Sequence, residues 1–165
     1  GSSSARTLPG VSPGSAASSI AIDDAIATAA TGDLWLFRGR STADRAIQKL
    51  AEGRASWAIP SPCLHEFIAT VTHAKIFVPP TPLATAIEEV EAWLESPSLV
   101  VLSETEAYWP FLKSLLLEGR IAGPQVHDAR IAALCQLHGV RELWTADRDF
   151  GRFPSIAVRN PLIRE

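Results

Sequence analysis

The sequence lacks the features that mark secreted and membrane-spanning proteins. None of its apolar runs approaches the ~20 residues that a transmembrane helix needs. The N-terminal stretch, GSSSARTLPGVSPGSAASS, contains a single basic residue and no apolar centre, so it does not have the pattern of a secretory signal. These absences indicate a cytoplasmic protein that does not associate with a membrane.

Cysteine is scarce as well, since Cys63 and Cys135 are the only two in the chain. Both lie in apolar helical patterns and neither belongs to a CxxC pair, so we interpret them as small buried hydrophobic residues. The HExxH motif of zinc hydrolases is also missing, because the pair His65-Glu66 is not followed by a histidine at position 69. Zinc chemistry is therefore not expected.

The glycine-rich patterns that hold phosphate groups, GxxxxGK[ST] and GxGxxG, are absent, which argues against binding of ATP or a dinucleotide. The formal net charge of −3 argues against bulk electrostatic capture of nucleic acid. Basic residues nevertheless cluster between positions 38 and 54 and in the C-terminal stretch that contains Arg148 and Arg152. The clusters could form a basic rim that binds RNA, and an ordinary solvated surface explains them equally well.

The chain divides into a leader and one domain. Residues 1–18 are rich in serine, glycine, proline and alanine, which predicts a disordered leader or a segment that derives from cloning. Over 19–165, short apolar runs alternate with longer helical patterns, as in the βαβ units of a single α/β domain with a parallel sheet. Strands are expected at 19–22, 57–59, 99–102, 143–145 and 157–159. Helices are expected over 42–52, from 62 to at least 71, over 82–95, from a capping box at Ser103 and Glu106 to about 118, and over 125–138.

Five acidic residues follow the expected strands. Asp23 comes directly after the first expected strand, and Glu66 lies about one turn into the helix after the second. Asp128 lies in the first turn of the helix that starts near 125, and Asp147 and Asp149 follow the fourth strand. The carboxyl ends of parallel strands meet at one edge of a sheet, so we expect these carboxylates to lie close together. Their mutual repulsion would be offset by Mg²⁺ or Mn²⁺, which prefer oxygen ligands. Such a site predicts hydrolysis of a phosphodiester by metal-activated water.

Three stretches resemble motifs of PIN-domain proteins, particularly the VapC-type toxins of bacterial toxin–antitoxin pairs. They are PSPCLHEF at 60–67, QVHDARIAAL at 125–134 and LWTADRDFGRF at 143–153. Each is weak alone, but their order and spacing are specific, and the resemblance covers roughly residues 54–162. It implies a three-layer α/β/α fold around a mainly parallel sheet of about five strands. It also implies a Mg²⁺- or Mn²⁺-dependent endoribonuclease that forms a homodimer and is blocked by an antitoxin partner.

Carried over motif by motif, the resemblance assigns the acidic positions of the family to Glu66, Asp128 and Asp147. Asp149 is the further acid of the DRDF element, whose role is more variable. Thr145 would supply a supporting hydroxyl that orients a carboxylate or a water molecule.

The N-terminal segment departs from the family pattern, which usually opens with a strand, an aspartate, any residue and an asparagine. Here 20–23 supplies a strand and Asp23, but Ala25 stands at the asparagine position. Asp23 is our first choice for the first acid, Asp24 the second and Asp33 the third. If none of them reaches the cluster, the alternative is a catalytically weak or inactive PIN-like module that binds RNA or an antitoxin without cutting.

Overall fold

The computed structural model describes residues 26–28, 40–161 and 163. The leader expected over 1–18 and the strand expected over 19–22 lie outside these residues. Within them the elements are β1 (Ile26–Thr28), α2 (Arg40–Glu52), β2 (Trp57–Pro60), α3 (Ser61–Val71), α4 (Leu83–Leu94), β3 (Leu99–Leu102), α5 (Tyr108–Gly119), α6 (Gln125–Leu137), β4 (Glu142–Trp144), the 3-10 helix η1 (Arg148–Arg152) and β5 (Ala157–Arg159). The expected α/β class is confirmed.

The strands form one sheet in the order β3-β2-β1-β4-β5, and every neighbouring pair is parallel. Strand β1 lies at the centre, where Ile26 pairs with Trp57 of β2 and with Glu142 of β4. Because all strands run in one direction, their carboxyl ends share one edge of the sheet. The expected parallel sheet is therefore confirmed.

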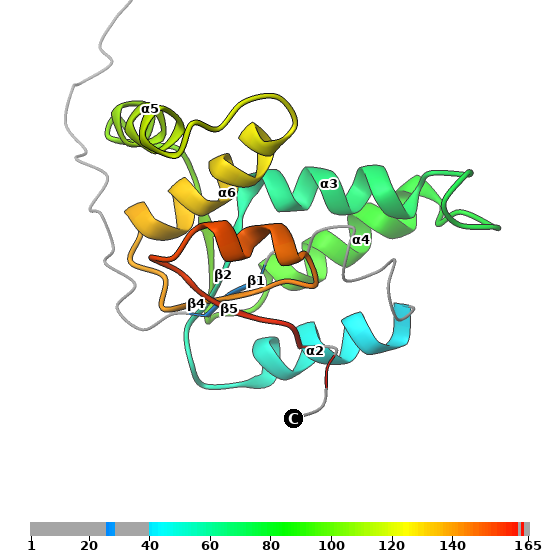
Figure 1. The fold of residues 1–165 in the computed structure, drawn as a ribbon. Helices are drawn as coiled ribbons and strands as arrows, with labels where there is room; N and C mark the ends of the chain where they lie inside the picture. The colour runs from blue at the N-terminus through cyan, green and yellow to red at the C-terminus, as the bar shows by residue number, and fades with distance from the viewer. Residues whose placement is uncertain (1–25, 29–39, 162, 164–165) are drawn as a thin grey trace, which may run out of the picture.

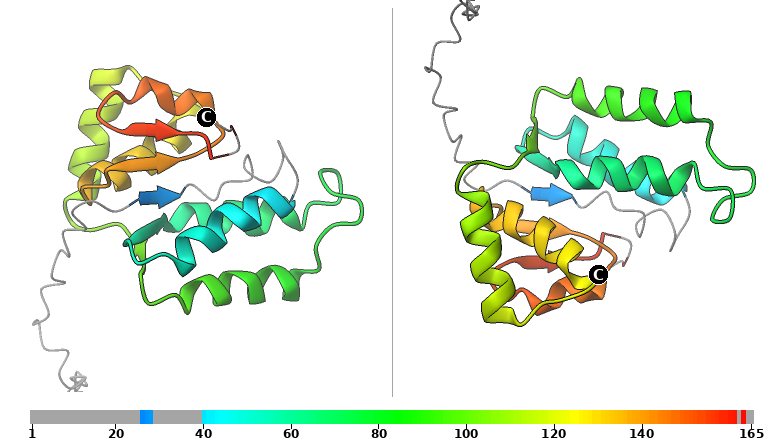
Figure 2. Two further views of the ribbon diagram at one scale, coloured as in Figure 1. Left: turned by 90° about the horizontal axis from the view of Figure 1, so that it is seen from below. Right: turned by 90° about the horizontal axis from the view of Figure 1, so that it is seen from above.

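Helices lie on both faces of the sheet. Figure 1 shows α2 on one side and α3 and α6 on the other, and the two views of Figure 2 agree with this arrangement. Strands covered on both faces are apolar along their whole length rather than at alternate positions, and all four residues of β2 are buried. The largest side chains without exposed surface, Trp57 and Phe67, come from β2 and α3. The ring centroid of Phe67 lies 4.6 Å from that of Trp93 on α4.

Helix α5 begins later than the sequence pattern predicted. The capping box at Ser103 and Glu106 is wrong, because the N-cap residue is Ala107 and it makes no side-chain capping bond. The Ser103 carbonyl oxygen instead lies 3.0 Å from Nε2 of His138 at the end of α6. Pro110 gives the physical reason for the late start: it lacks an N–H and is tolerated only in the first turn of a helix.

Both cysteines are buried thiols that form no disulfide, as the sequence predicted. Burial raises the pKa of the Cys135 thiol to about 12, so this thiol stays protonated near neutral pH. Among the described helices, none is long and apolar enough to cross a membrane.

Candidate functional site

The turn after β4 places Asp147 and Asp149 side by side. Asp147 is the N-cap residue of η1, and its Oδ1 accepts a hydrogen bond of 2.8 Å from the backbone N–H of Asp149. The backbone N–H of Asp147 donates to Oγ1 of Thr145 over 3.1 Å. Thr145 is 1% exposed, and its own N–H donates to the carbonyl of Arg159 at the end of β5. A buried hydroxyl tied to the sheet therefore fixes the backbone of the first aspartate.

Asp128 reaches the same place from α6. The chain turns at Gly123, which has a φ of +62°, and Pro124 is the N-cap residue of the helix. The N–H of Val126 donates to the Gly123 carbonyl over 3.1 Å, so the start of the helix is fixed by this Gly-Pro turn. Asp128 lies in the first turn, where the helix dipole favours a negative charge, and its side chain is half-buried.

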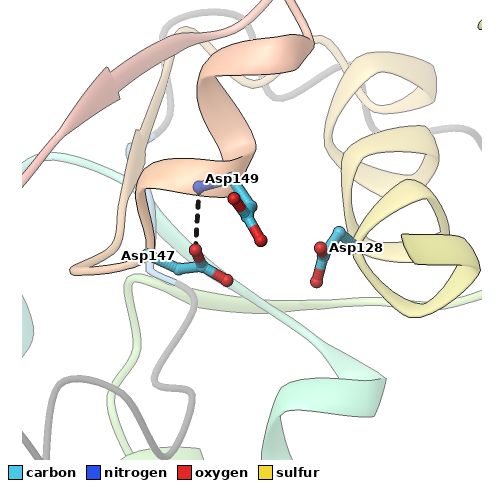
Figure 3. Close-up of side chains that lie close together, drawn as sticks. All are labelled: Asp128, Asp147 and Asp149. Carbon is cyan, nitrogen blue, oxygen red and sulfur yellow. Dashed lines mark hydrogen bonds between the residues drawn. The ribbon is translucent and has the colours of Figure 1, made fainter. Parts of the chain in front are cut away.

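These three aspartates converge. One carboxylate oxygen from each of Asp128, Asp147 and Asp149 lies within 4.8 Å of the other two. In Figure 3 the Asp128 side chain points from α6 toward the pair on the turn after β4. At this separation each pair of like charges repels by about 1 to 3 kcal/mol, for effective dielectric constants between about 80 and 20. Capping explains the positions of single aspartates, but it does not require three carboxylates to face one another.

The donor atoms of this cluster are oxygens, with no sulfur and no imidazole nitrogen among them. Hard divalent cations prefer such ligands, and the half-burial of Asp128 and Asp147 reduces competition from bulk water. The acidic triad can therefore bind a metal ion, although this chemistry does not identify the ion.

Glu66 is not a member of the triad. It lies on α3, which begins where β2 ends, and its side chain is half-buried. Of the acids expected at this edge, the structure thus brings Asp128, Asp147 and Asp149 together, and their roles stay predictions. The three candidates for the first acid, Asp23, Asp24 and Asp33, lie outside the described residues.

Arg148 and Arg152, expected as RNA contacts, are both exposed members of η1. Arg152 is engaged with the triad: its Nε donates to the Asp149 carbonyl over 3.0 Å, and its Nη2 lies 3.7 Å from Asp149 Oδ1. The sequence analysis missed this pair. Its only signal was the i,i+3 spacing, which brings two side chains together once the segment is helical.

A family profile described as PIN domain matches residues 34–156, which is more than half of the chain. The chain belongs to the PIN domain family.

This PIN domain is homologous to VapC toxin ribonucleases. It is 30% identical to Ribonuclease VapC48 of Mycobacterium tuberculosis over 95 residues, which cover 58% of this chain and 66% of that protein, just under two thirds of its length. Ribonuclease VapC43 of the same organism is 30% identical over 116 residues, covering 70% of this chain and 78% of that protein.

Solved structures share the fold at lower identity. VapBC2 from Rickettsia felis, solved bound to a DNA fragment from its promoter, matches with a TM-score of 0.52 and 19% identity over 82% of this chain and 98% of that chain. A toxin–antitoxin complex from Klebsiella pneumoniae matches with a TM-score of 0.51 and 21% identity over 84% and 98%.

Proposed function

We propose that this PIN domain is a Mg²⁺- or Mn²⁺-dependent endoribonuclease that hydrolyses RNA phosphodiester bonds, and that it is the toxin of a toxin–antitoxin pair. The observation that carries the proposal is the convergence of three carboxylates, Asp128, Asp147 and Asp149, in a member of a family whose relatives are named as VapC ribonucleases. The three-layer α/β/α arrangement expected of such an enzyme is part of the same proposal.

The residues have separate tasks in this scheme. Asp128 and Asp147 hold the cation from two elements, which keeps the site rigid, and Asp149 completes the triad on the exposed side. Thr145 keeps Asp147 in place through the bond to its backbone N–H. When bound, a divalent cation supplies Lewis acidity that activates a water molecule and offsets the charge that develops on the phosphodiester. Glu66, on α3, is the further acid of this scheme.

The first acid of the site stays a prediction, and the position of β1 changes the order of the candidates. Asp23 and Asp24 precede β1 in the sequence, whereas Asp33 follows it. Because the functional residues of a parallel sheet follow the carboxyl ends of its strands, this order favours Asp33. Separate Asn variants of the three aspartates would identify the ligand as the one whose loss weakens binding of Mn²⁺.

The proposed partners are RNA, an antitoxin and a second copy of the chain. The matched structures from Rickettsia felis and Klebsiella pneumoniae are described as VapBC and as a toxin–antitoxin complex, which supports an antitoxin here. Large apolar side chains also remain exposed on α4 and in the loop before it, which supports coverage by a protein. They are Ile76, Val78, Leu83, Ile87 and Leu94.

The proposal is tested by the variant Asp128→Asn, which keeps the size of the side chain and removes one anionic ligand. RNA cleavage in Mg²⁺ should fall by about a hundredfold, the upper end of the effect known for groups that only orient metal ligands. The melting temperature should stay close to that of the parent. Loss of the Asp128 charge removes repulsion by Asp147 and Asp149 as well as attraction to the start of α6, so the two effects offset each other. The control is Glu91→Gln, which removes an exposed acid of α4 and should leave cleavage unchanged.

Unchanged cleavage in Asp128→Asn would refute the site. If the parent itself does not cut RNA in Mg²⁺ or Mn²⁺ but binds it, the chain is the inactive RNA-binding or antitoxin-binding module instead.

A further inference from the structure

The side chain of Arg152 holds one member of the acidic triad through two contacts. Its Nε donates to the backbone carbonyl of Asp149 over 3.0 Å, and its Nη2 lies 3.7 Å from Oδ1 of the same residue. The Asp149 carboxylate therefore has two candidate partners, an internal guanidinium and an external cation. Both are attracted by the charge of one carboxylate, so a guanidinium held against it weakens its attraction for the cation.

The two contacts differ in strength. The Nε bond has the length of an ordinary hydrogen bond, whereas the 3.7 Å ion pair is longer than the 2.7–2.9 Å typical of a charge-assisted bond. The side chains of Arg152 and Asp149 are 31% and 64% exposed, so water screens the pair. The ion pair between Nη2 and Oδ1 can therefore break while the Nε hydrogen bond still holds the Arg152 side chain against the backbone of η1.

We propose that Arg152 competes with the divalent cation for Asp149 and thereby lowers the metal affinity of the site. The proposal rests on the proposed metal site, and it makes Arg152 a positioning residue that regulates this site rather than only a contact on a basic rim. A cation at the triad would have to draw the charge of the Asp149 carboxylate away from the guanidinium. The free guanidinium then lies beside the cluster.

The test is titration of Mn²⁺ into the metal-free protein, with the free ion measured by its magnetic resonance signal. Arg152→Gln should bind Mn²⁺ about threefold to fivefold more tightly than the parent, the range expected for loss of a partly exposed ion pair. The matched control is Arg148→Gln, which removes the same charge from the same 3-10 helix. Arg148→Gln should change the Mn²⁺ affinity less, because loss of this charge acts on the cation only through long-range electrostatics that salt screens.

A second pair of variants distinguishes competition for Asp149 from long-range repulsion between the arginine and the cation. In an Asp149→Asn background, Arg152→Gln should lose its advantage over Arg148→Gln, because the contested carboxylate is gone. An equal gain in the presence and absence of Asp149 would refute the competition, since the effect would then pass through space to the other aspartates. Weaker binding in Arg152→Gln would also refute it, because the arginine would then be preparing Asp149 for the metal.

Failure of this inference can be told from failure of the proposed function. A parent protein that binds no Mn²⁺ overturns the metal site and the competition together. A parent that binds Mn²⁺ with the affinity of Arg152→Gln overturns the competition alone. If Arg152→Gln does not fold by circular dichroism, Arg152→Lys serves instead, because a lysine cannot make both contacts and should shift the affinity in the same direction by less.

Discussion

Thr145 is buried, and its hydroxyl accepts a hydrogen bond from the backbone N–H of Asp147. A buried polar group is stabilising only when its hydrogen bond is made. The bond also sets the direction in which the Asp147 carboxylate leaves the backbone. Thr145 therefore connects the interior of the sheet to the proposed metal site.

We expect Thr145→Val to weaken binding of Mn²⁺ by about tenfold, as for other groups that orient metal ligands. It should also lower the free energy of unfolding by about 1 to 2 kcal/mol, because the Asp147 N–H loses its acceptor. Both are measurable by Mn²⁺ titration and urea denaturation. Thr145→Ser keeps the hydroxyl and should keep the metal affinity. If packing were its only role, the isosteric valine would be harmless and the serine would be the damaging variant.

The sequence located the aspartates better than it described their contacts. Asp147 and Asp149 were placed correctly because they follow a recognisable apolar strand, and Asp128 because a Gly-Pro break marks the start of its helix. No helix was expected between the strands at 143–145 and 157–159, whereas five residues of that segment form η1. Without that short helix, neither the bond between the two aspartates nor the approach of Arg152 to Asp149 could be anticipated.

At the level of elements, the end of α6 decides how the chain returns to the sheet. The N–H of Gly139 donates to the Gln136 carbonyl over 3.1 Å, and that of Val140 donates to the Cys135 carbonyl over 2.9 Å. These two bonds and the φ of +70° at Gly139 make a Schellman motif. It satisfies carbonyls at the helix end and directs the chain into β4, which carries the site residues at its far end.

Gly139→Ala should lower the free energy of unfolding by about 1 to 2 kcal/mol, because an alanine in the left-handed region suffers a steric penalty of this size. No atom lies within 4 Å of the added methyl group, so the loss would come from the backbone alone. Gly151→Ala is the control, since it also has open space and no positive φ. Urea denaturation of both variants checks the prediction, and equal stabilities would contradict it.

Elements with a strong local signal were predicted closely. The strands at 99–102 and 157–159 have the predicted bounds, and α6 ends one residue earlier than expected because His138 is already outside its regular geometry. The predicted start of α5 was wrong because a capping box is a local preference, and Pro110 is tolerated only in the first turn of the helix. The carbonyl of Ser103 is held by His138, which lies 35 residues further along the chain. Contacts between distant segments of this kind leave no periodic pattern in the sequence.

Across the whole molecule, the order of the strands explains why residues far apart in sequence share one site. Strand β1 separates β2 from β4, so α3 and the turn after β4 flank the centre of the sheet at its carboxyl edge. The parallel direction could be inferred from the alternation of strands and helices. The central strand itself could not be located, because β1 has three residues and lies within a long alanine-rich stretch without clear alternation.

The net charge of −3 means that RNA must be attracted by local groups rather than by the molecule as a whole. Arg148 and Arg152 flank the triad on η1, whereas the exposed Arg54 precedes β2 at the opposite edge of the sheet. Arg148→Ala and Arg152→Ala should each weaken RNA binding. Each should also flatten the plot of log affinity against log salt by about 0.7 for every RNA phosphate that the variant no longer neutralises.

Arg54→Ala removes the same charge and should leave both the affinity and the slope near those of the parent. Binding is best followed by fluorescence anisotropy of a labelled RNA, with Asp128→Asn present in every protein so that the strand stays intact. A slope that changes equally at all three positions would mean that RNA responds to total charge. The arginines of η1 would then have no special place in binding, and their position beside the aspartates would matter only for the metal.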